Sequence, residues 1–160
     1  MASVLGIGDV ADRNVPIEQC AATILRAVDA GLNVIDTAPN YEDGYSEQIV
    51  GHALRGIRDR MFVISKVDEL TSPVAPQVEG SLARLGMSHT DAFVFHNLSD
   101  LDVFRTLMQP GGGFDQLGHC VRRGLTRLYR RTTRRAATTL ATDSGIKATA
   151  VCRLLPPCTT

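Results

Sequence analysis

Four short apolar runs recur along the first hundred residues at nearly regular intervals. They are Val4–Ile7, Asn33–Ile35, Met61–Ile64 and Ala92–Phe95, and their starts lie 29, 28 and 31 residues apart. A strand followed by a helix takes roughly 30 residues, so the spacing indicates a repeated strand–helix unit. Each run is continuously apolar, which is typical of parallel strands covered on both faces. The pattern therefore predicts an α/β fold with a parallel sheet.

The segments between these runs have the apolar periodicity of helices. Their apolar positions span residues 17–28, 49–54, 78–85 and 114–121, and glycines follow at Gly31, Gly56, Gly86 and Gly124. Pro16 suits the first turn of the first helix. Ser46 and Glu47 suit the start of the second, where a hydroxyl can cap the helix and a carboxylate meets its positive end.

Polar side chains that could take part in catalysis lie where the predicted strands end. Asp36 ends the second strand, Lys66 the third and His96 the fourth, and Tyr41 follows Asp36 in a loop. The carboxyl ends of parallel strands line one edge of a sheet, so we expect these groups to meet. Asp36 would keep Lys66 charged, and an ammonium beside Tyr41 would favour loss of the phenol proton. We infer that Tyr41 can donate a proton and that His96 can donate a hydrogen bond to a substrate oxygen.

Each of these residues also has a structural explanation when taken alone. A loop tyrosine is usually an amphipathic surface residue, a histidine at a strand end is usually a satisfied polar group, and an Asp–Lys pair is usually structural. Four such groups on neighbouring strand ends of one sheet edge favour a catalytic site instead.

Composition narrows the class of protein. The four cysteines, Cys20, Cys120, Cys152 and Cys158, show no zinc-type spacing, so we expect no metal site and free thiols in a reducing compartment such as the cytoplasm. No apolar run approaches the length of a membrane span, and no signal peptide is visible.

Charge is distributed unevenly along the chain. Residues 1–115 carry 8 Lys and Arg against 16 Asp and Glu, whereas residues 116–160 carry 9 against one. Seven arginines between 122 and 135 would permit contacts with phosphates, but only Tyr129 interleaves an aromatic side chain, which argues against a nucleic-acid site. The alternative, which we favour, is a shift of reading frame near residue 128, because composition and pattern change there together.

One stretch, "GLNVIDTAPNYEDGYSEQIVGHAL", resembles the signature of the aldo-keto reductase family. "VISK" and "SLARLGMSHTDAFVFH" resemble the two landmarks that follow it in that family, so the resemblance covers about residues 4–127. It implies a (β/α)8 TIM barrel that reduces small aldehydes or ketones with NADPH, or with NADH as the alternative. By the family's pattern Tyr41 is the general acid, and His96 orients the substrate. Lys66 and Asp36 are the pair that tunes the pKa of Tyr41.

The chain also departs from the family's pattern. Glu42 stands where the family usually has glycine, and we expect the apolar strand that normally follows Gly124 to be missing. Residues 1–127 would then form a half barrel of about four βα units, and residues 128–160 an irregular basic tail. The usual cofactor phosphate loops, and any glycine-rich turn at a helix start that could replace them, are also expected to be missing, so no cofactor-binding residue is assigned.

Exposed edges make a homo-oligomer an alternative to a monomer. Two functions besides reductase stay open: an inactive barrel fragment or interaction module, and a nucleic-acid-binding tail.

Overall fold

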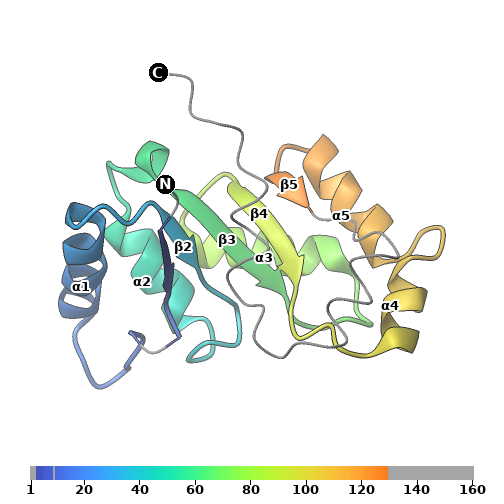
Figure 1. Ribbon diagram of the computed structural model, residues 1–160, viewed down its shortest axis with the longest axis horizontal. Helices are drawn as coiled ribbons and strands as arrows, with labels where there is room; N and C mark the ends of the chain where they lie inside the picture. The colour runs from blue at the N-terminus through green and yellow to red at the C-terminus, as the bar shows by residue number, and fades with distance from the viewer. Residues whose placement is uncertain (1–2, 9, 130–160) are drawn as a thin grey trace.

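Each strand of the described chain pairs in parallel with the strand that follows it in the sequence. The computed structural model describes residues 3–8 and 10–129 (Figure 1). Its elements are β1 (Val4–Gly6), α1 (Ile17–Asp29), β2 (Val34–Asp36), α2 (Tyr45–Ala53), the 3-10 turn η1 (Arg58–Arg60), β3 (Phe62–Val67), α3 (Val74–Leu85), β4 (Thr90–Phe95), α4 (Leu101–Leu107), α5 (Gly113–Arg122) and β5 (Thr126–Tyr129). The sheet order is β1-β2-β3-β4-β5, and the parallel α/β class predicted from the apolar runs is confirmed.

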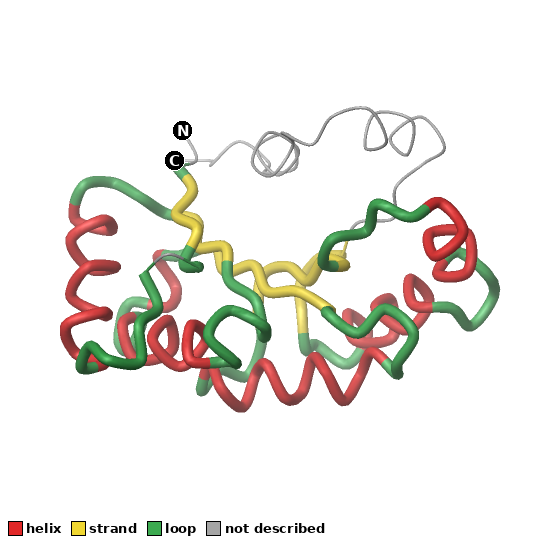
Figure 2. Tube along the Cα trace, turned by 90° about the horizontal axis from the view of Figure 1, so that it is seen from below, coloured by secondary structure: helices red, strands yellow, loops and turns green. Residues whose placement is uncertain are grey.

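The helices cover one face of this sheet. Viewed edge-on, the long helices gather on one side of the strands (Figure 2). Both buried apolar clusters lie on that side: Ile35 and Val63 pack among side chains of α1 and α2, and Val67 and Phe93 pack among side chains of α3 and α5. Burial of this apolar area is the main force that holds the helices on the sheet.

The opposite face carries the alternate positions of the same strands. Asp36 is in register with Ile64, Ile64 with Ala92, and Ala92 with Leu128, so these four residues share a face. None of them belongs to either apolar cluster, and Leu128 is 44% exposed. Side chains on this face are therefore available for chemistry rather than for helix packing.

Helices α2 and α3 approach each other unusually closely. A Cβ atom added at Gly51 would overlap the carbonyl oxygen of Leu85, so only glycine fits there. Beside this contact Glu47 is fully buried and accepts hydrogen bonds from Ser65 Oγ and from Arg84 Nε, each at 2.6 Å. These two hydrogen bonds join α2 to the middle of β3 and to α3.

The predicted helix cap at Ser46 is wrong. Gly44, in a left-handed conformation with φ 80°, precedes α2, and no side chain caps the helix. Ser46 Oγ instead lies 2.6 Å from Thr37 Oγ1 in the buried interior. The packing of α2 on the strand ends decides the direction of this side chain, which local sequence does not reveal.

Two elements differ from the sequence prediction. The strand expected to be missing after Gly124 is present as β5, which pairs with β4 through Thr90 and Thr126. Helix α4 was not predicted; its first turn is capped by Asp100, which accepts hydrogen bonds from the backbone N–H groups of Asp102 and Val103. These bonds hold the pKa of the Asp100 carboxyl below its ordinary value. The basic tail predicted for residues 128–160 lies almost wholly outside the described residues.

The first arginines of the basic region belong to the fold. Arg127 Nη1 lies 3.0 Å from Asp91 Oδ1 and Arg123 Nη2 lies 2.6 Å from Glu79 Oε1. Asp91 is buried and also accepts hydrogen bonds from Arg58 Nη2 and from the backbone N–H of Val63. Arg127 thus joins β5 to β4, and Arg123 joins the end of α5 to α3.

Candidate active site

Strand register brings Asp36 and Lys66 to the same face at the carboxyl edge of the sheet. Asp36 is the last residue of β2, and its register partner is Ile64. Lys66 lies two residues beyond Ile64, so it shares that face, and one strand step of two residues is about 6.6 Å. A lysine side chain readily spans this offset. Lys66 Nζ lies 2.6 Å from Asp36 Oδ1.

The ammonium of Lys66 is held by three oxygen atoms. Besides Asp36, it donates to the backbone carbonyl of Thr37 at 2.8 Å and approaches Tyr41 Oη at 3.3 Å. The side chain of Lys66 is 10% exposed, and a charge taken out of water to this degree needs such partners. Thr37 was not among the predicted site residues; its role lies in the backbone, where residue type gives no signal.

Tyr41 belongs to the loop that follows β2, and its ring packs against the loop that follows β1. Its ring is 4.8 Å from Lys66 Nζ, and a Cβ atom at Gly8 would lie 3.8 Å from the ring carbons. The next residues, Glu42 and Asp43, have positive φ angles of 49° and 51°. Glu42 therefore adopts the left-handed conformation for which glycine is better suited, at a cost of roughly 1–2 kcal/mol.

Arg13 offsets part of this cost. Arg13 Nη2 donates hydrogen bonds to the carbonyl oxygens of Glu42 at 2.6 Å and Asp43 at 3.0 Å. The guanidinium of Arg13, in the loop after β1, thus binds both carbonyls and stabilises the left-handed turn. This explains how the turn after Tyr41 forms without the family's usual glycine.

His96, which directly follows β4, completes the group. Its backbone N–H donates to the carbonyl of Val67 at 2.9 Å, which continues the β3–β4 pairing by one step. Its ring meets the Tyr41 ring edge-on with centroids 5.8 Å apart. On its other side, His96 Nδ1 lies 2.6 Å from Asp68 Oδ1, a residue that the sequence analysis missed. All four predicted site residues are thus brought together.

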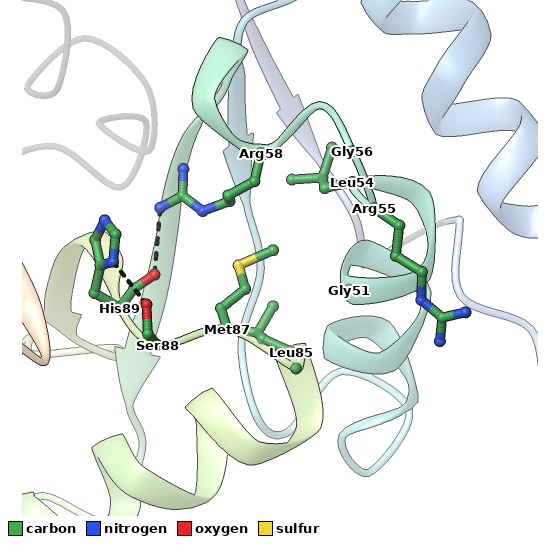
Figure 3. A pocket seen from close by; sticks show the side chains of 10 residues that line it. Gly51, Leu54, Arg55, Gly56, Arg58, Leu85, Met87, Ser88 and His89 are labelled. Carbon is green, nitrogen blue, oxygen red and sulfur yellow. Dashed lines mark hydrogen bonds between the residues drawn. The ribbon is translucent and has the colours of Figure 1, made fainter.

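Other features of the described chain lie away from this group. A cavity of about 300 Å³ occurs at the opposite edge of the sheet, where β3 and β4 begin (Figure 3). Arg58 points toward His89 there and donates to its carbonyl at 3.3 Å, whereas Arg55 turns away (Figure 3). Cys20 and Cys120 are free and buried, and burial raises the pKa of the Cys120 thiol, so it packs as a neutral group. Within residues 3–8 and 10–129, no group of three or more metal-ligating side chains could hold a metal ion.

A glycine-rich turn does precede one helix, although none was expected that could hold a cofactor phosphate. Gly111, Gly112 and Gly113 lead into α5. Their space is occupied by the chain itself: a Cβ at Gly112 would meet three backbone oxygens at 2.7–2.9 Å, and one at Gly113 would meet Phe95. Asp115 Oδ2 already accepts from the N–H of Gly111 at 2.9 Å. A carboxylate at this helix start disfavours a phosphate, so the turn serves packing.

The structure thus combines a parallel α/β sheet with a Tyr–Lys–Asp–His group at the carboxyl edge of its strands. The family model described as "Aldo/keto reductase family" matches residues 4–137. The chain belongs to the aldo/keto reductase family, as the sequence resemblance predicted.

Known proteins of this family resemble the chain in sequence and in structure. Methylglyoxal reductase YeaE of Escherichia coli is 36% identical over 78 residues, which are 47% of this chain and 28% of that protein. The NADH-specific methylglyoxal reductase of E. coli is 34% identical over 99 residues, with 48% and 30% covered. The structure of an aldo-keto reductase from Klebsiella pneumoniae in complex with NADPH matches with a TM-score of 0.66 and 31% identity over 79% of this chain and 43% of that chain. The matched part of this chain thus spans less than half of these relatives.

Within the described residues, no helix is both long and apolar enough to cross a membrane.

Proposed function

We propose that this chain carries the proton-donating part of a carbonyl reductase site that acts on small aldehydes or ketones. The observation that carries the proposal is the contact of Lys66 Nζ with both Asp36 and Tyr41 Oη. An ammonium 3.3 Å from a phenol oxygen stabilises the phenolate left behind after proton donation. Asp36 and the Thr37 carbonyl hold this ammonium beside Tyr41 Oη.

Tyr41 and His96 have different roles in the reduction of a carbonyl group. Tyr41 donates its proton to the carbonyl oxygen as negative charge develops there, and the product is an alcohol. His96, whose ring meets Tyr41 edge-on, orients the same oxygen. Water is partly excluded, because the side chains of Lys66 and His96 are each only 10% exposed.

The remaining requirement is a hydride. No amino-acid side chain supplies one, so a proton-donor set of this composition fits a site that works with a reduced nicotinamide cofactor, which provides hydride to the carbonyl carbon when bound. Relatives that bind NADPH or are named NADH-specific support a nicotinamide and leave the choice between the two open. We assign none of the described residues to the phosphates of this cofactor.

The buried free thiols of Cys20 and Cys120 agree with the reducing cytoplasm expected from the sequence.

The test uses the purified chain and a chimera. The chimera joins residues 1–129 to the part of the K. pneumoniae aldo-keto reductase that follows the matched region. Methylglyoxal is the probe substrate, because two relatives are named for it. We expect the chimera to oxidise NADPH or NADH when methylglyoxal is added, and the chain alone to bind either cofactor weakly.

Two results would count against the proposal. A folded chimera that binds cofactor but reduces neither methylglyoxal nor a panel of aldehydes and ketones would remove the reductase function. Turnover that persists in the chimera when Tyr41 and Lys66 are both replaced would locate the proton donor elsewhere.

A further inference from the structure

One ring nitrogen of His96 contacts a residue outside the Tyr–Lys–Asp–His group. His96 Nδ1 lies 2.6 Å from Asp68 Oδ1. Asp68 directly follows β3, and the hydrogen bond from the His96 N–H to the Val67 carbonyl fixes the two backbones next to each other. The side chain of Asp68 is 29% exposed and that of His96 10% exposed, so the contact is partly open to solvent on the Asp68 side.

This contact decides which ring nitrogen carries hydrogen. A carboxylate oxygen has no hydrogen and only accepts, so a nitrogen 2.6 Å away from it must be the donor. Neutral imidazole has a single N–H, and which nitrogen bears it is set by the hydrogen bond that the other nitrogen makes. With hydrogen on Nδ1, the neutral His96 ring has a bare Nε2 that accepts hydrogen bonds and cannot donate one.

Within residues 3–8 and 10–129, the charged groups around the ring do not supply an alternative partner for Nδ1. Tyr41 faces the ring through its edge contact. Lys66 is engaged by Asp36, the Thr37 carbonyl and Tyr41 Oη. Among the residues that the structure describes, Asp68 is thus the charged group in direct contact with the imidazole.

We propose that Asp68 is a positioning residue that holds His96 in its Nδ1–H form, so that Nε2 donates a hydrogen bond to a carbonyl oxygen only when His96 is an imidazolium. This inference deepens the proposed function and rests on it for the identity of the acceptor. The tautomer itself does not depend on turnover. Raising the pH removes the proton from Nε2 and leaves Nδ1 protonated against the carboxylate.

Nitrogen NMR of the chain as it exists tests the proposal directly. The sequence contains four histidines, and a His96→Gln variant assigns the His96 signals by their loss. The ¹⁵N shifts of both ring nitrogens are followed from about pH 5 to about pH 9, which brackets the ordinary histidine range near ~6.5. We expect Nε2 alone to move to the position of an unprotonated ring nitrogen.

Asp68→Ala removes the acceptor. We expect both His96 nitrogens to move to intermediate shifts at high pH, which indicates a mixture of tautomers. Glu69→Ala is the matched control, because Glu69 is the neighbouring exposed acid and makes its hydrogen bonds to Gln77 through the backbone. This control and the signals of His52, His89 and His119 should not change.

Two outcomes overturn the proposal. One is a native His96 that loses its proton from Nδ1. The other is an Asp68→Ala chain, still folded by its amide spectrum, in which the His96 tautomer is unchanged. Should Asp68→Ala unfold, Asp68→Asn keeps the shape of the side chain, and the native titration still decides. Because no cofactor or substrate is present, failure of the reductase assay would not alter these readings.

Discussion

Lys66 Nζ lies 2.6 Å from Asp36 Oδ1 although 30 residues separate the two in sequence. The distance follows from the parallel register of β2 and β3, which places both residues on one sheet face and near one edge. The same ammonium approaches Tyr41 Oη, so one ion pair couples a strand end to a loop phenol. Much of the expected chemistry depends on this relationship.

Replacing Tyr41 by Phe tests the proton donor. In the chimera we expect Tyr41→Phe to lower kcat/KM for methylglyoxal by about 10²–10⁴-fold, the usual contribution of general acid catalysis. Cofactor affinity, measured by fluorescence titration, should change little because the ring remains. The matched control is Tyr45→Phe, which removes only a hydroxyl that donates to the Val15 carbonyl at 3.3 Å. Activity within twofold of the parent would exclude Tyr41 as the acid.

Replacing Lys66 by Arg tests whether geometry or charge matters. One nitrogen of Lys66 serves Asp36, the Thr37 carbonyl and Tyr41 together, and a planar guanidinium cannot place a single nitrogen among all three. We expect Lys66→Arg to lose most carbonyl reduction in the chimera. Arg105→Lys is the control, because that side chain is 65% exposed, and it should leave carbonyl reduction unchanged. A fully active Lys66→Arg chimera would show that charge alone suffices.

The close contact of α2 and α3 predicts a stability effect at Gly51. A methyl group there would overlap the Leu85 carbonyl oxygen, so we expect Gly51→Ala to lower the free energy of unfolding by about 1–3 kcal/mol. Gly80→Ala is the control, since its nearest neighbour is the flexible end of Arg84 at 3.5 Å and alanine favours the helix. Urea unfolding followed by circular dichroism measures both. Equal stability of the two variants would contradict the contact.

The cap of α4 predicts a local dependence on pH. Backbone N–H groups lower the pKa of Asp100 in the folded chain, so the charged cap adds stability above the ordinary carboxyl range. This contribution is lost as the pH falls through the lowered pKa, below about pH 4. In Asp100→Asn the cap does not titrate, so amide exchange of Val103 should lose part of its acid sensitivity. The prediction fails if both chains show the same pH profile.

The open strands predict self-association. Among the described residues, β1 and β5 each pair with a neighbour on one side only. Unpaired strand edges are templates for another chain, so we expect the average mass to rise with concentration. Sedimentation measured from about 1 μM to about 1 mM, a range in which exposed edges promote association, provides the test. A constant monomer mass would show that these edges are protected.

Local sequence was sufficient for strands β1 to β4 and for the residue types at their ends, but not for β5. The apolar runs at β2 and β4 and the breaks at Gly31 and Gly86 are local signals, because strand burial and left-handed helix ends restrict residue type at each position. The family match agrees with the resemblance stated from motifs alone. The roles of Tyr41 and its neighbours stay predictions.

Contacts between distant segments were decided by the tertiary structure. Thr37 contributes a backbone carbonyl, which any residue could supply, and Asp68 is one of many loop acids until β4 brings His96 beside it. Ser46 resembles a helix cap in sequence, yet packing turns it toward Thr37. The sequence by itself determined which residue types stand at the strand ends. Only the folded register determined which atoms of those residues come within hydrogen-bonding distance, because that depends on parallel pairing across about 30 residues.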